Sequence, residues 1–189
     1  GVRYHFRSDG KPFRFDTGYS DVFLSNAAIL GINLTEIDSI VLSHGHNDHS
    51  WGLNHFAQHL DRVNHQDAKK IKIVAHPNAF LPKYYEDKSI GTNLPADGYP
   101  TLFERVEQPG VYYLTDNLLF LGEIARNNDF EGLEPVGKTV DCCGHKVEDF
   151  VTDDSAIVYT SPEGIVIITG CSHSGICNII DYAIKVTND

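Results

Sequence analysis

The stretch Ile40–Leu53 reads I-V-L-S-H-G-H-N-D-H-S-W-G-L and places three histidines and an aspartate within six consecutive positions. The run Ile37–Ser43 before them is too short for a helix and contains Ile and Val, which predicts a short buried strand. His44 and His46 are two residues apart, so on an extended backbone both imidazoles leave the same side of the chain. The end of this strand therefore delivers two nitrogen donors into one small volume.

Asp48 and His49 add an oxygen and a nitrogen donor where the chain must turn. The whole pattern, H-x-H-x-D-H, suits a borderline metal ion such as zinc, which accepts imidazole nitrogen and carboxylate oxygen. A polar surface loop is the alternative interpretation, but turns rich in Ser, Gly and Asn do not need three imidazoles. The stretch is therefore predicted to be a metal site.

A second unit of the same kind occurs near the end of the chain. The run Ile165–Thr169 predicts a strand, and it leads through Gly170-Cys171-Ser172 to His173. A helix with an apolar face and a cap at Ser174 is expected to follow. His173 is the candidate third ligand of the site built by His44 and His46, and a buried, helix-capping histidine is the alternative. Cys171 is either a weak ligand or a packed small residue, and packing is favoured.

Four segments resemble the motifs of the metallo-β-lactamase superfamily. They are F-D-T-G at Phe15–Gly18, S-H-G-H-N-D-H-S-W-G-L at Ser43–Leu53, F-L-G-E-I-A-R at Phe120–Arg126 and T-G-C-S-H-S-G-I-C-N-I-I at Thr169–Ile180. Together they are similar to the branch of stand-alone metal-dependent hydrolases that includes proteins similar to a dihydropterin ribofuranosylaminobenzene phosphate synthase. The resemblance implies an α/β (α+β) fold, the four-layer αββα sandwich, with residues 1–189 forming a single domain.

The resemblance also implies a dinuclear metal centre, with zinc as the expected metal and iron or manganese as alternatives. One ion is expected on His44, His46 and His173, and the second on Asp48 and His49. Asp48 would also be catalytic, since it would orient a metal-activated hydroxide that attacks an ester, phosphoester or related bond. Asp16 is expected to brace the ligand loop through hydrogen bonds without binding metal, and a plain Asp-Thr-Gly turn is the alternative.

Other functions are compatible with the same fold. A synthase in the biosynthesis of a pterin or methanopterin-type cofactor is one, and a metal-binding protein without catalysis is another. An iron oxidoreductase is disfavoured because that branch of the family carries an acid where His46 stands. A complete site of this family takes two further ligands from the last quarter of the domain, and nothing after His173 supplies them. The chain is therefore expected to lack the C-terminal quarter of the sandwich. It is also expected to lack the N-terminal start, because it contains no methionine and its first residues resemble the interior of a domain.

Two further residues are candidates for contact with the substrate. His76 follows the predicted strand Ile71–Ala75, and a structural role is its alternative. Arg126 could bind an anionic group, and a surface ion pair with Asp129 or Glu131 is its alternative. A long connecting or lid loop is expected over about residues 80–110, and an irregular loop over residues 127–149.

Composition limits the partners. The chain has 189 residues and a formal net charge of −11, which argues against nucleic acid or an anionic membrane as the main partner and leaves a small-molecule substrate. Four cysteines, of which Cys142 and Cys143 are adjacent, do not form a secreted disulfide pattern, so a reduced, cytoplasmic setting is expected. The segment Cys142–His145 lacks the two-residue gap of a zinc knuckle, and that interpretation is rejected. The sequence does not indicate an oligomeric state.

The remaining elements follow from hydrophobic periodicity and turn residues. Strands are expected at Val2–Phe6 and Pro12–Asp16, and a short helix at Ser20–Leu30. Two hairpins are expected further along, one formed by Val111–Leu114 with Leu118–Ile124 and the other by Ala156–Thr160 with Ile165–Thr169. A second helix is expected after His49, and its apolar face comprises Leu53, Phe56, Ala57, Leu60 and Val63.

Overall fold

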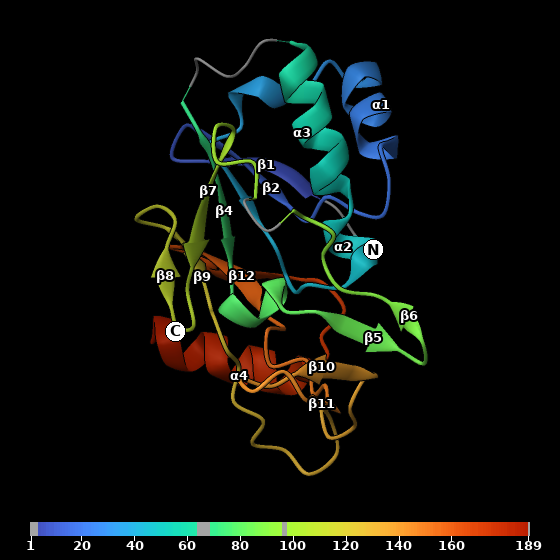
Figure 1. Cartoon of the computed structure of the whole chain (residues 1–189). Coiled ribbons are helices and arrows are strands. Elements are labelled where there is room, and N and C mark those ends of the chain that lie inside the picture. Colours follow the sequence, from blue (N-terminus) through green and yellow to red (C-terminus); the bar gives the residue numbers. More distant parts are fainter. Residues whose placement is uncertain (1–3, 64–68, 96–97, 189) are drawn as a thin grey trace.

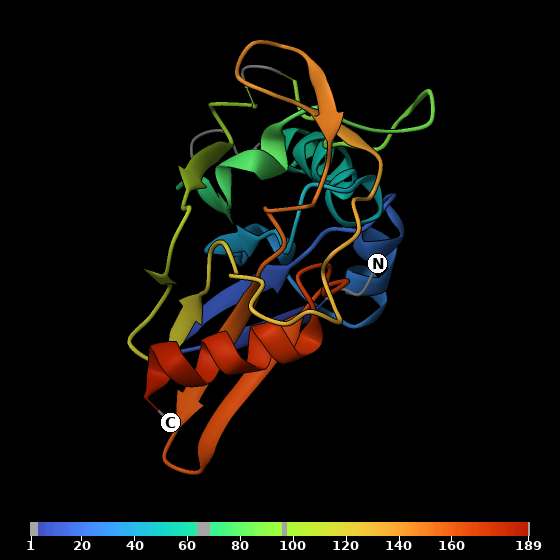
Figure 2. The ribbon, with the colours of Figure 1, turned by 90° about the horizontal axis from the view of Figure 1, so that it is seen from below.

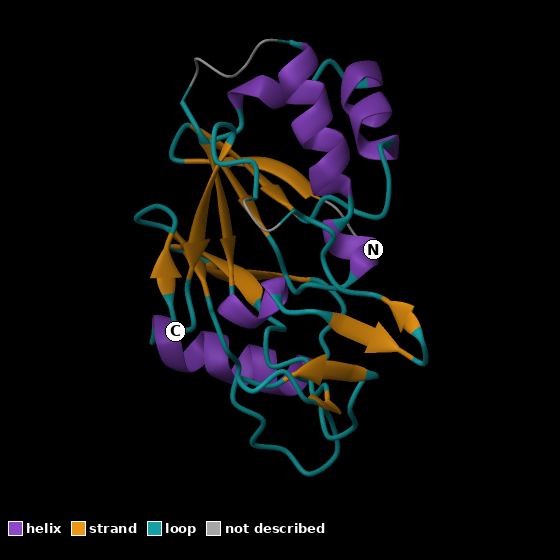
Figure 3. Ribbon diagram, in the orientation of Figure 1, coloured by secondary structure: helices purple, strands orange, loops and turns teal. Residues whose placement is uncertain are grey.

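The computed structural model describes residues 4–63, 69–95 and 98–188. Two sheets lie face to face at its centre, with helices α1 and α3 on one outer side and α4 on the other (Figure 1). Figure 3 shows the same layers by element type, and Figure 2 shows α4 crossing the outer face of its sheet. This is the predicted αββα sandwich, and the fold class is confirmed.

The first sheet has the strand order β1-β2-β3-β4-β7. Strands β1 and β2 form an antiparallel hairpin, and β2, β3, β4 and β7 run parallel to one another. Their bounds are Tyr4–Ser8 for β1, Lys11–Phe15 for β2, Ser39–Val41 for β3, Ile71–Ala75 for β4 and Phe103–Glu107 for β7. The carboxyl ends of β2, β3 and β4 therefore meet at one edge, and the residues after these strands are Asp16, Leu42 and His76.

The second sheet is antiparallel and has the order β13-β12-β9-β8. Its strands are Gly164–Thr169 for β13, Ala156–Ser161 for β12, Leu118–Phe120 for β9 and Tyr112–Tyr113 for β8. Both predicted hairpins are present here, because β8 pairs with β9 and β12 with β13. The helices are α1 at Val22–Ile29, α2 at Asn47–Ser50, α3 at Gly52–Arg62 and α4 at Ile176–Thr187, with 3-10 turns at Leu34–Glu36 and Pro77–Phe80.

Alternation along the strands produces three apolar cores between the four layers. In β3, Ile40 packs in the core under α1 and α3, whereas its neighbour Val41 faces the second sheet. In β12, Ile157 lies between the sheets, and Ala156 and Val158 lie in the core under α4. A one-residue shift in register would exchange these faces, so the pattern fixes how the strands pair.

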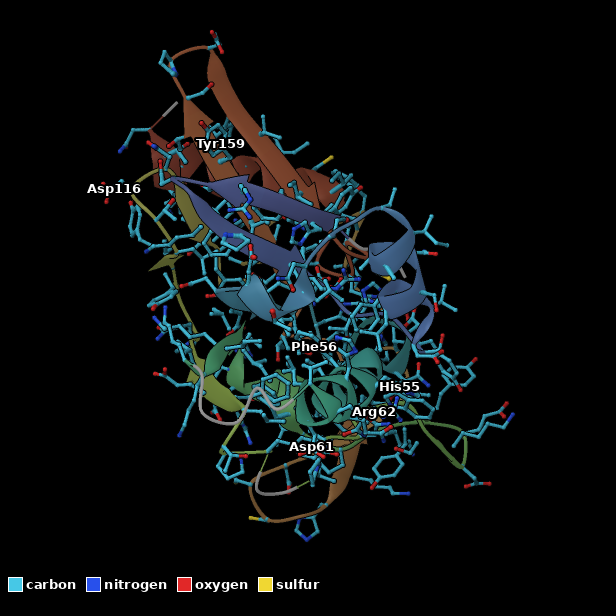
Figure 4. The ribbon with its side chains drawn as sticks, turned by 90° about the horizontal axis from the view of Figure 1, so that it is seen from above. His55, Phe56, Asp61, Arg62, Asp116 and Tyr159 are labelled. Atoms are coloured by element: carbon cyan, nitrogen blue, oxygen red, sulfur yellow. The ribbon has the colours of Figure 1, made fainter. Side chains whose placement is uncertain are left out.

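Helix α3 packs on the first sheet through the apolar side chains that the sequence spacing predicts. Leu53, Phe56, Ala57 and Leu60 are all buried. Figure 4 shows Phe56 on the side of α3 that faces the sheet, with His55 and Arg62 on the outer side. Val63 was also expected on the apolar face, but it is 48% exposed because the helix ends at Arg62.

Two predicted loops contain regular structure. The segment 80–110 includes β7 and the short strands β5 (Lys83–Tyr85) and β6 (Lys88–Ser89), so the long-loop prediction is wrong. The segment 127–149 contains a hairpin formed by β10 (Lys138–Val140) and β11 (Lys146–Glu148), which joins β5 and β6 in a third small sheet. The strands β5, β6, β10 and β11 have two or three residues each, too few for a period-2 pattern to be visible in the sequence.

Helix α4 begins where it was expected, but its cap differs. The Ser174 hydroxyl donates to Asp154 Oδ2 at 2.6 Å and does not cap the helix. The carboxylate of Glu131 instead accepts from the backbone N–H groups of Cys177 and Asn178, at 3.2 and 2.7 Å. Within the described residues, no helix is both long and apolar enough to cross a lipid bilayer.

Phe120→Ala tests the core between the two sheets. Phe120 is fully buried there, so its truncation removes apolar contact and leaves a cavity. We expect the free energy of unfolding to fall by about 3–5 kcal/mol in urea denaturation. Phe130→Ala is the matched control, since Phe130 is 68% exposed, and equal losses in the two variants would contradict the packing described here.

Candidate metal centre

His44 and His46 lie just beyond the end of β3, in the segment that leads into α2. His46 has an extended backbone, with φ −66° and ψ 150°, and precedes the first residue of α2. Gly45 between them allows the backbone to pass against the turn Pro77–Phe80, because a Cβ built on Gly45 would lie 2.1 Å from the Ala79 carbonyl oxygen. Both histidines are buried, and their ring centroids are 4.6 Å apart.

His173 reaches the same place from the other sheet. It follows β13 after a turn in which Ser172 has φ 58°, a left-handed conformation that costs energy in any residue other than glycine. The His173 ring centroid is 4.8 Å from that of His44 and 5.1 Å from that of His46. One donor atom from each of the three residues lies within 4.8 Å of the others. The structure thus brings the three predicted ligands of the first ion together.

In each of the three histidines, the Nε2 atom has no hydrogen-bond partner. The Nε2 atoms of His44, His46 and His173 are each buried and make no hydrogen bond. A buried polar atom without a partner costs about 1–3 kcal/mol, so three at one point indicate a common ligand. Three neutral imidazole nitrogens are a typical donor set for zinc, and the residues present fit this ion.

Hydrogen bonds from Asp16 set which nitrogen of His44 can bind a metal. Ser43 Oγ donates to Asp16 Oδ2 at 2.8 Å, and Ser43 Oγ lies 2.9 Å from His44 Nδ1. Because the hydroxyl proton goes to the carboxylate, Ser43 Oγ accepts from His44 Nδ1–H, which leaves Nε2 unprotonated. The Ser43 backbone N–H also donates to Asp16 Oδ1 at 2.8 Å. Asp16 therefore holds the loop that carries His44 through hydrogen bonds, and its role beside a bound metal stays a prediction.

His49 is held by the same carboxylate but faces a different set of donors. Its Nδ1 lies 2.7 Å from Asp16 Oδ2, while its Nε2 is 3.2 Å from Cys171 Sγ and 3.3 Å from Asp48 Oδ2. His44, His49 and Cys171 form a second group whose donor atoms lie within 4.8 Å of one another. The prediction that Cys171 only packs is wrong, because its thiol faces His49. A signal was present in the sequence, since Cys171 stands two residues before a candidate ligand.

Burial and neighbouring charge divide the histidines into two kinds. Burial lowers the pKa of His44 well below its ordinary value, and the neighbouring imidazoles lower it further. Burial and His173 lower the pKa of His46 to about 4. Burial also disfavours the charged form of His49, but hydrogen bonds to Asp16, Asp48 and Cys171 outweigh it and raise the pKa to about 11. In the absence of a metal, His44 and His46 are therefore neutral at pH 7 and His49 is protonated.

Asp48 is the most exposed of the predicted ligands, with 44% of its side chain accessible. The hydrogen bond from His49 lowers the pKa of its carboxyl well below the usual range. The same kind of bond lowers the pKa of the Cys171 thiol to about 7, with His173 contributing most and His49 next. The carboxylate of Asp48 and the thiol of Cys171 thus both lie close to His49 Nε2.

The comparisons with known proteins agree with this geometry. The model of the metallo-β-lactamase superfamily matches residues 6–70. The crystal structure of Tm1679, a metal-dependent hydrolase of the β-lactamase superfamily, superposes with a TM-score of 0.72 and 27% identity over 95% of this chain and 66% of that one. The chain is therefore similar to the metallo-β-lactamase superfamily in sequence over residues 6–70 and shares its fold.

Two proteins of Methanocaldococcus jannaschii are also similar to this chain. An uncharacterized protein is 33% identical over 182 residues, covering 95% of this chain and 65% of the relative. A 7,8-dihydropterin-6-methyl-4-(β-D-ribofuranosyl)-aminobenzene-5′-phosphate synthase is 31% identical over 188 residues, covering 94% of this chain and 61% of the relative. The chain thus spans less than two thirds of the length of either.

The other two site predictions for this metallo-β-lactamase-fold chain concern His76 and Arg126, and both side chains make contacts within the protein. His76 is buried, and its Nδ1 accepts from the Asn78 backbone N–H at 3.2 Å. Arg126 donates through Nη2 to the carbonyl oxygens of Phe150 and Val151. The alternative ion pair with Glu131 is wrong, since Glu131 caps α4. Neither residue belongs to the histidine groups, and their roles in substrate binding remain predictions.

A buried triad of charged side chains supports the segment that carries His44 and His46. No local pattern in the sequence predicts it. Lys83 Nζ donates to Asp149 Oδ2 at 2.8 Å and to Asp153 Oδ1 at 2.7 Å. Asp153 Oδ2 in turn accepts from the backbone N–H of Gly45 at 2.7 Å. Burial disfavours the charged amine, but the two aspartates outweigh it and raise the pKa of Lys83. The triad links β5 to the segment that carries His44 and His46.

Asp16→Asn tests the brace on the ligand loop. The amide cannot accept from all three of the donors that the carboxylate serves, so His44 and His49 lose their fixed orientation. We expect zinc affinity to fall by about 10- to 100-fold in competition with a chromogenic chelator. Asp116→Asn is the control, since Asp116 lies at an exposed hairpin turn (Figure 4). Unchanged zinc affinity in folded Asp16→Asn protein would contradict the assigned brace.

Lys83→Met tests the triad under the loop. The substitution keeps the length of the side chain but leaves two buried carboxylates without their cation. Breaking a buried pair in this way typically costs about 3–5 kcal/mol of unfolding free energy. Lys88→Met, at an exposed position in β6, is the matched control. The two variants are compared by urea denaturation at neutral pH, and similar stability in both would rule out this role of Lys83.

Proposed function

We propose that the chain carries the metal centre of a hydrolase that uses zinc and acts on a small anionic substrate. The observation that carries the proposal is the convergence of three buried, unpartnered Nε2 atoms, from His44, His46 and His173. His44, His46 and His173 would hold zinc there, and the ion would provide an acidified water as nucleophile and stabilise charge on the attacked group. The similarity to Tm1679, a metal-dependent hydrolase of the β-lactamase superfamily, supports the reaction class.

The residues around this centre would have different roles. His44, His46 and His173 would hold the first ion, and Asp48 and His49 would hold a second, with the Cys171 thiol as an additional donor. Asp16 and Ser43 fix the imidazole orientations through their hydrogen bonds. The half-exposed carboxylate of Asp48 would orient the attacking water. The bond attacked is proposed to be an ester, phosphoester or a related bond.

A synthase is the second candidate function, and one observation favours it. The 7,8-dihydropterin-6-methyl-4-(β-D-ribofuranosyl)-aminobenzene-5′-phosphate synthase aligns with 94% of this chain at 31% identity. The same imidazole cluster could hold a metal that polarises a phosphorylated pterin precursor instead of activating water. A panel of phosphodiesters and lactones distinguishes the two: turnover lost with chelator and restored with zinc supports the hydrolase, whereas inertness of zinc-loaded protein across the panel counts against it.

His46→Ala tests the metal assignment directly. Removal of one of three imidazoles should abolish tight binding of the first zinc ion, because the remaining two cannot complete the donor set. We expect plasma emission analysis of dialysed protein to show at least one zinc fewer per chain than in the wild type, and any turnover on the panel to be lost. His55→Ala, on the outer side of α3, should keep both (Figure 4). Unchanged zinc stoichiometry in His46→Ala would refute the assignment.

A further inference from the structure

The tip of the β10–β11 hairpin carries a second set of metal-ligating side chains, on a hairpin to which none of the candidate site residues belongs. The sequence Asp141-Cys142-Cys143-Gly144-His145 places four potential donors in five positions. Donor atoms from Asp141, Cys143 and His145 lie within 4.8 Å of one another. All four cysteines of the chain are free thiols, and Cys142 and Cys143 are exposed. Figure 2 shows this hairpin at the periphery of the molecule.

The backbone of the turn is closed by its own hydrogen bonds. Asp141 N–H donates to the His145 carbonyl at 3.0 Å, and Gly144 N–H donates to the Asp141 carbonyl at 3.0 Å. Gly144 has φ +82°, a conformation that glycine adopts without strain and that lets the chain reverse. Asp141 Oδ1 also accepts from the N–H groups of Cys143 and His145, both at 2.8 Å. One carboxylate oxygen therefore shapes the turn, and Oδ2 faces His145 Nδ1.

Two of the separations between the donor atoms match those around a tetrahedral zinc ion. With zinc–nitrogen and zinc–oxygen bonds of about 2.1 Å, two such ligands lie about 3.4 Å apart. Asp141 Oδ2 and His145 Nδ1 are 3.3 Å apart. With zinc–sulfur bonds of about 2.3 Å, two thiolates lie about 3.8 Å apart. Cys142 Sγ and Cys143 Sγ are 3.9 Å apart. This distance is far beyond a disulfide, which needs about 2.05 Å.

We propose that the turn Asp141–His145 binds a zinc ion through a carboxylate oxygen of Asp141, the Cys143 thiolate and the His145 imidazole, with the adjacent Cys142 thiolate, which lies outside that group, recruited as the fourth ligand. This site is separate from the histidine centre and does not depend on the proposed hydrolase function. The absence of a two-residue gap excludes a knuckle, but here the turn at Gly144 supplies the chain reversal that the gap normally provides. Binding displaces the thiol protons, so zinc affinity at this turn increases with pH.

A metal-free ion pair is the competing explanation for the contact between Asp141 and His145. His145 has 76% of its side chain exposed, and a pair so open to water contributes little to stability. Such an ion pair does not involve the neighbouring thiols of Cys142 and Cys143. The thiols therefore distinguish the two explanations, because they report on zinc binding and play no part in the ion pair.

Cobalt(II), a spectroscopic substitute for zinc, provides the test. It is added to the full chain carrying Cys171→Ser, so that no thiol remains at the histidine centre, and the thiolate-to-cobalt charge-transfer absorption is recorded. We expect the absorption in this background, its displacement by zinc, and its loss on adding either Cys143→Ser or His145→Ala. Cys177→Ser, which removes a thiol on α4, is the control and should leave the absorption unchanged.

A second measurement distinguishes loss of metal binding from misfolding of a variant. Thermal unfolding of the metal-free variants should match that of the metal-free Cys171→Ser protein, because the substituted side chains are exposed. In the folded proteins, zinc should slow alkylation of Cys142 and Cys143 but not of Cys177. No charge-transfer absorption in the Cys171→Ser background overturns the proposal, and so does an absorption that persists without His145. Loss of zinc from the histidine centre leaves the charge-transfer absorption and the alkylation rates unchanged. Failure of the hydrolase proposal is therefore distinguishable from failure of this one.

Discussion

The carboxylate of Asp16 is the group on which the arrangement of the centre depends. It lies at the end of β2 in a left-handed conformation, with φ 58°, and it is fully buried. Its oxygens accept from the Ser43 amide and hydroxyl and from His49 Nδ1. Because it takes the hydroxyl proton, it also determines the tautomer of His44. A single carboxylate thus orients potential donors in both histidine groups.

The fold explains why distant segments meet at this carboxylate. Parallel strands β2, β3 and β4 end at one edge of the first sheet, and β13 ends at the matching edge of the second sheet. The core between the sheets, which includes Phe13, Val41 and Ile157, sets the distance between these edges. Gly170, after β13, comes so close to the first sheet that a Cβ there would lie 2.3 Å from Ser43 Oγ. Packing in the core therefore controls whether His173 can reach His44 and His46.

The sequence predicts those parts of the site that depend on local pattern. Two strands followed by histidines indicate a shared centre, since strand ends in a sandwich gather at one edge. The sequence could not show the triad around Lys83, because its partners lie 66 and 70 residues away and nothing local marks a lysine for burial. The same limit applies to Glu131, which caps α4 from a segment more than 40 residues earlier. Interactions of this kind are specified by tertiary packing, whereas strands and amphipathic helices are specified by periodicity.

The centre concentrates features that reduce stability. Asp16 and Ser172 have positive φ values, three imidazole nitrogens are buried without partners, and Lys83 is a fully buried cation. Each of these costs free energy in the metal-free protein, and the surrounding cores must offset that cost. A divalent ion on His44, His46 and His173 would satisfy the unpartnered nitrogens, so metal binding and folding stability are coupled. The apolar cores and the ion triad can be seen as the scaffold that keeps these donors in place before the metal binds, which is the requirement for a preorganised site.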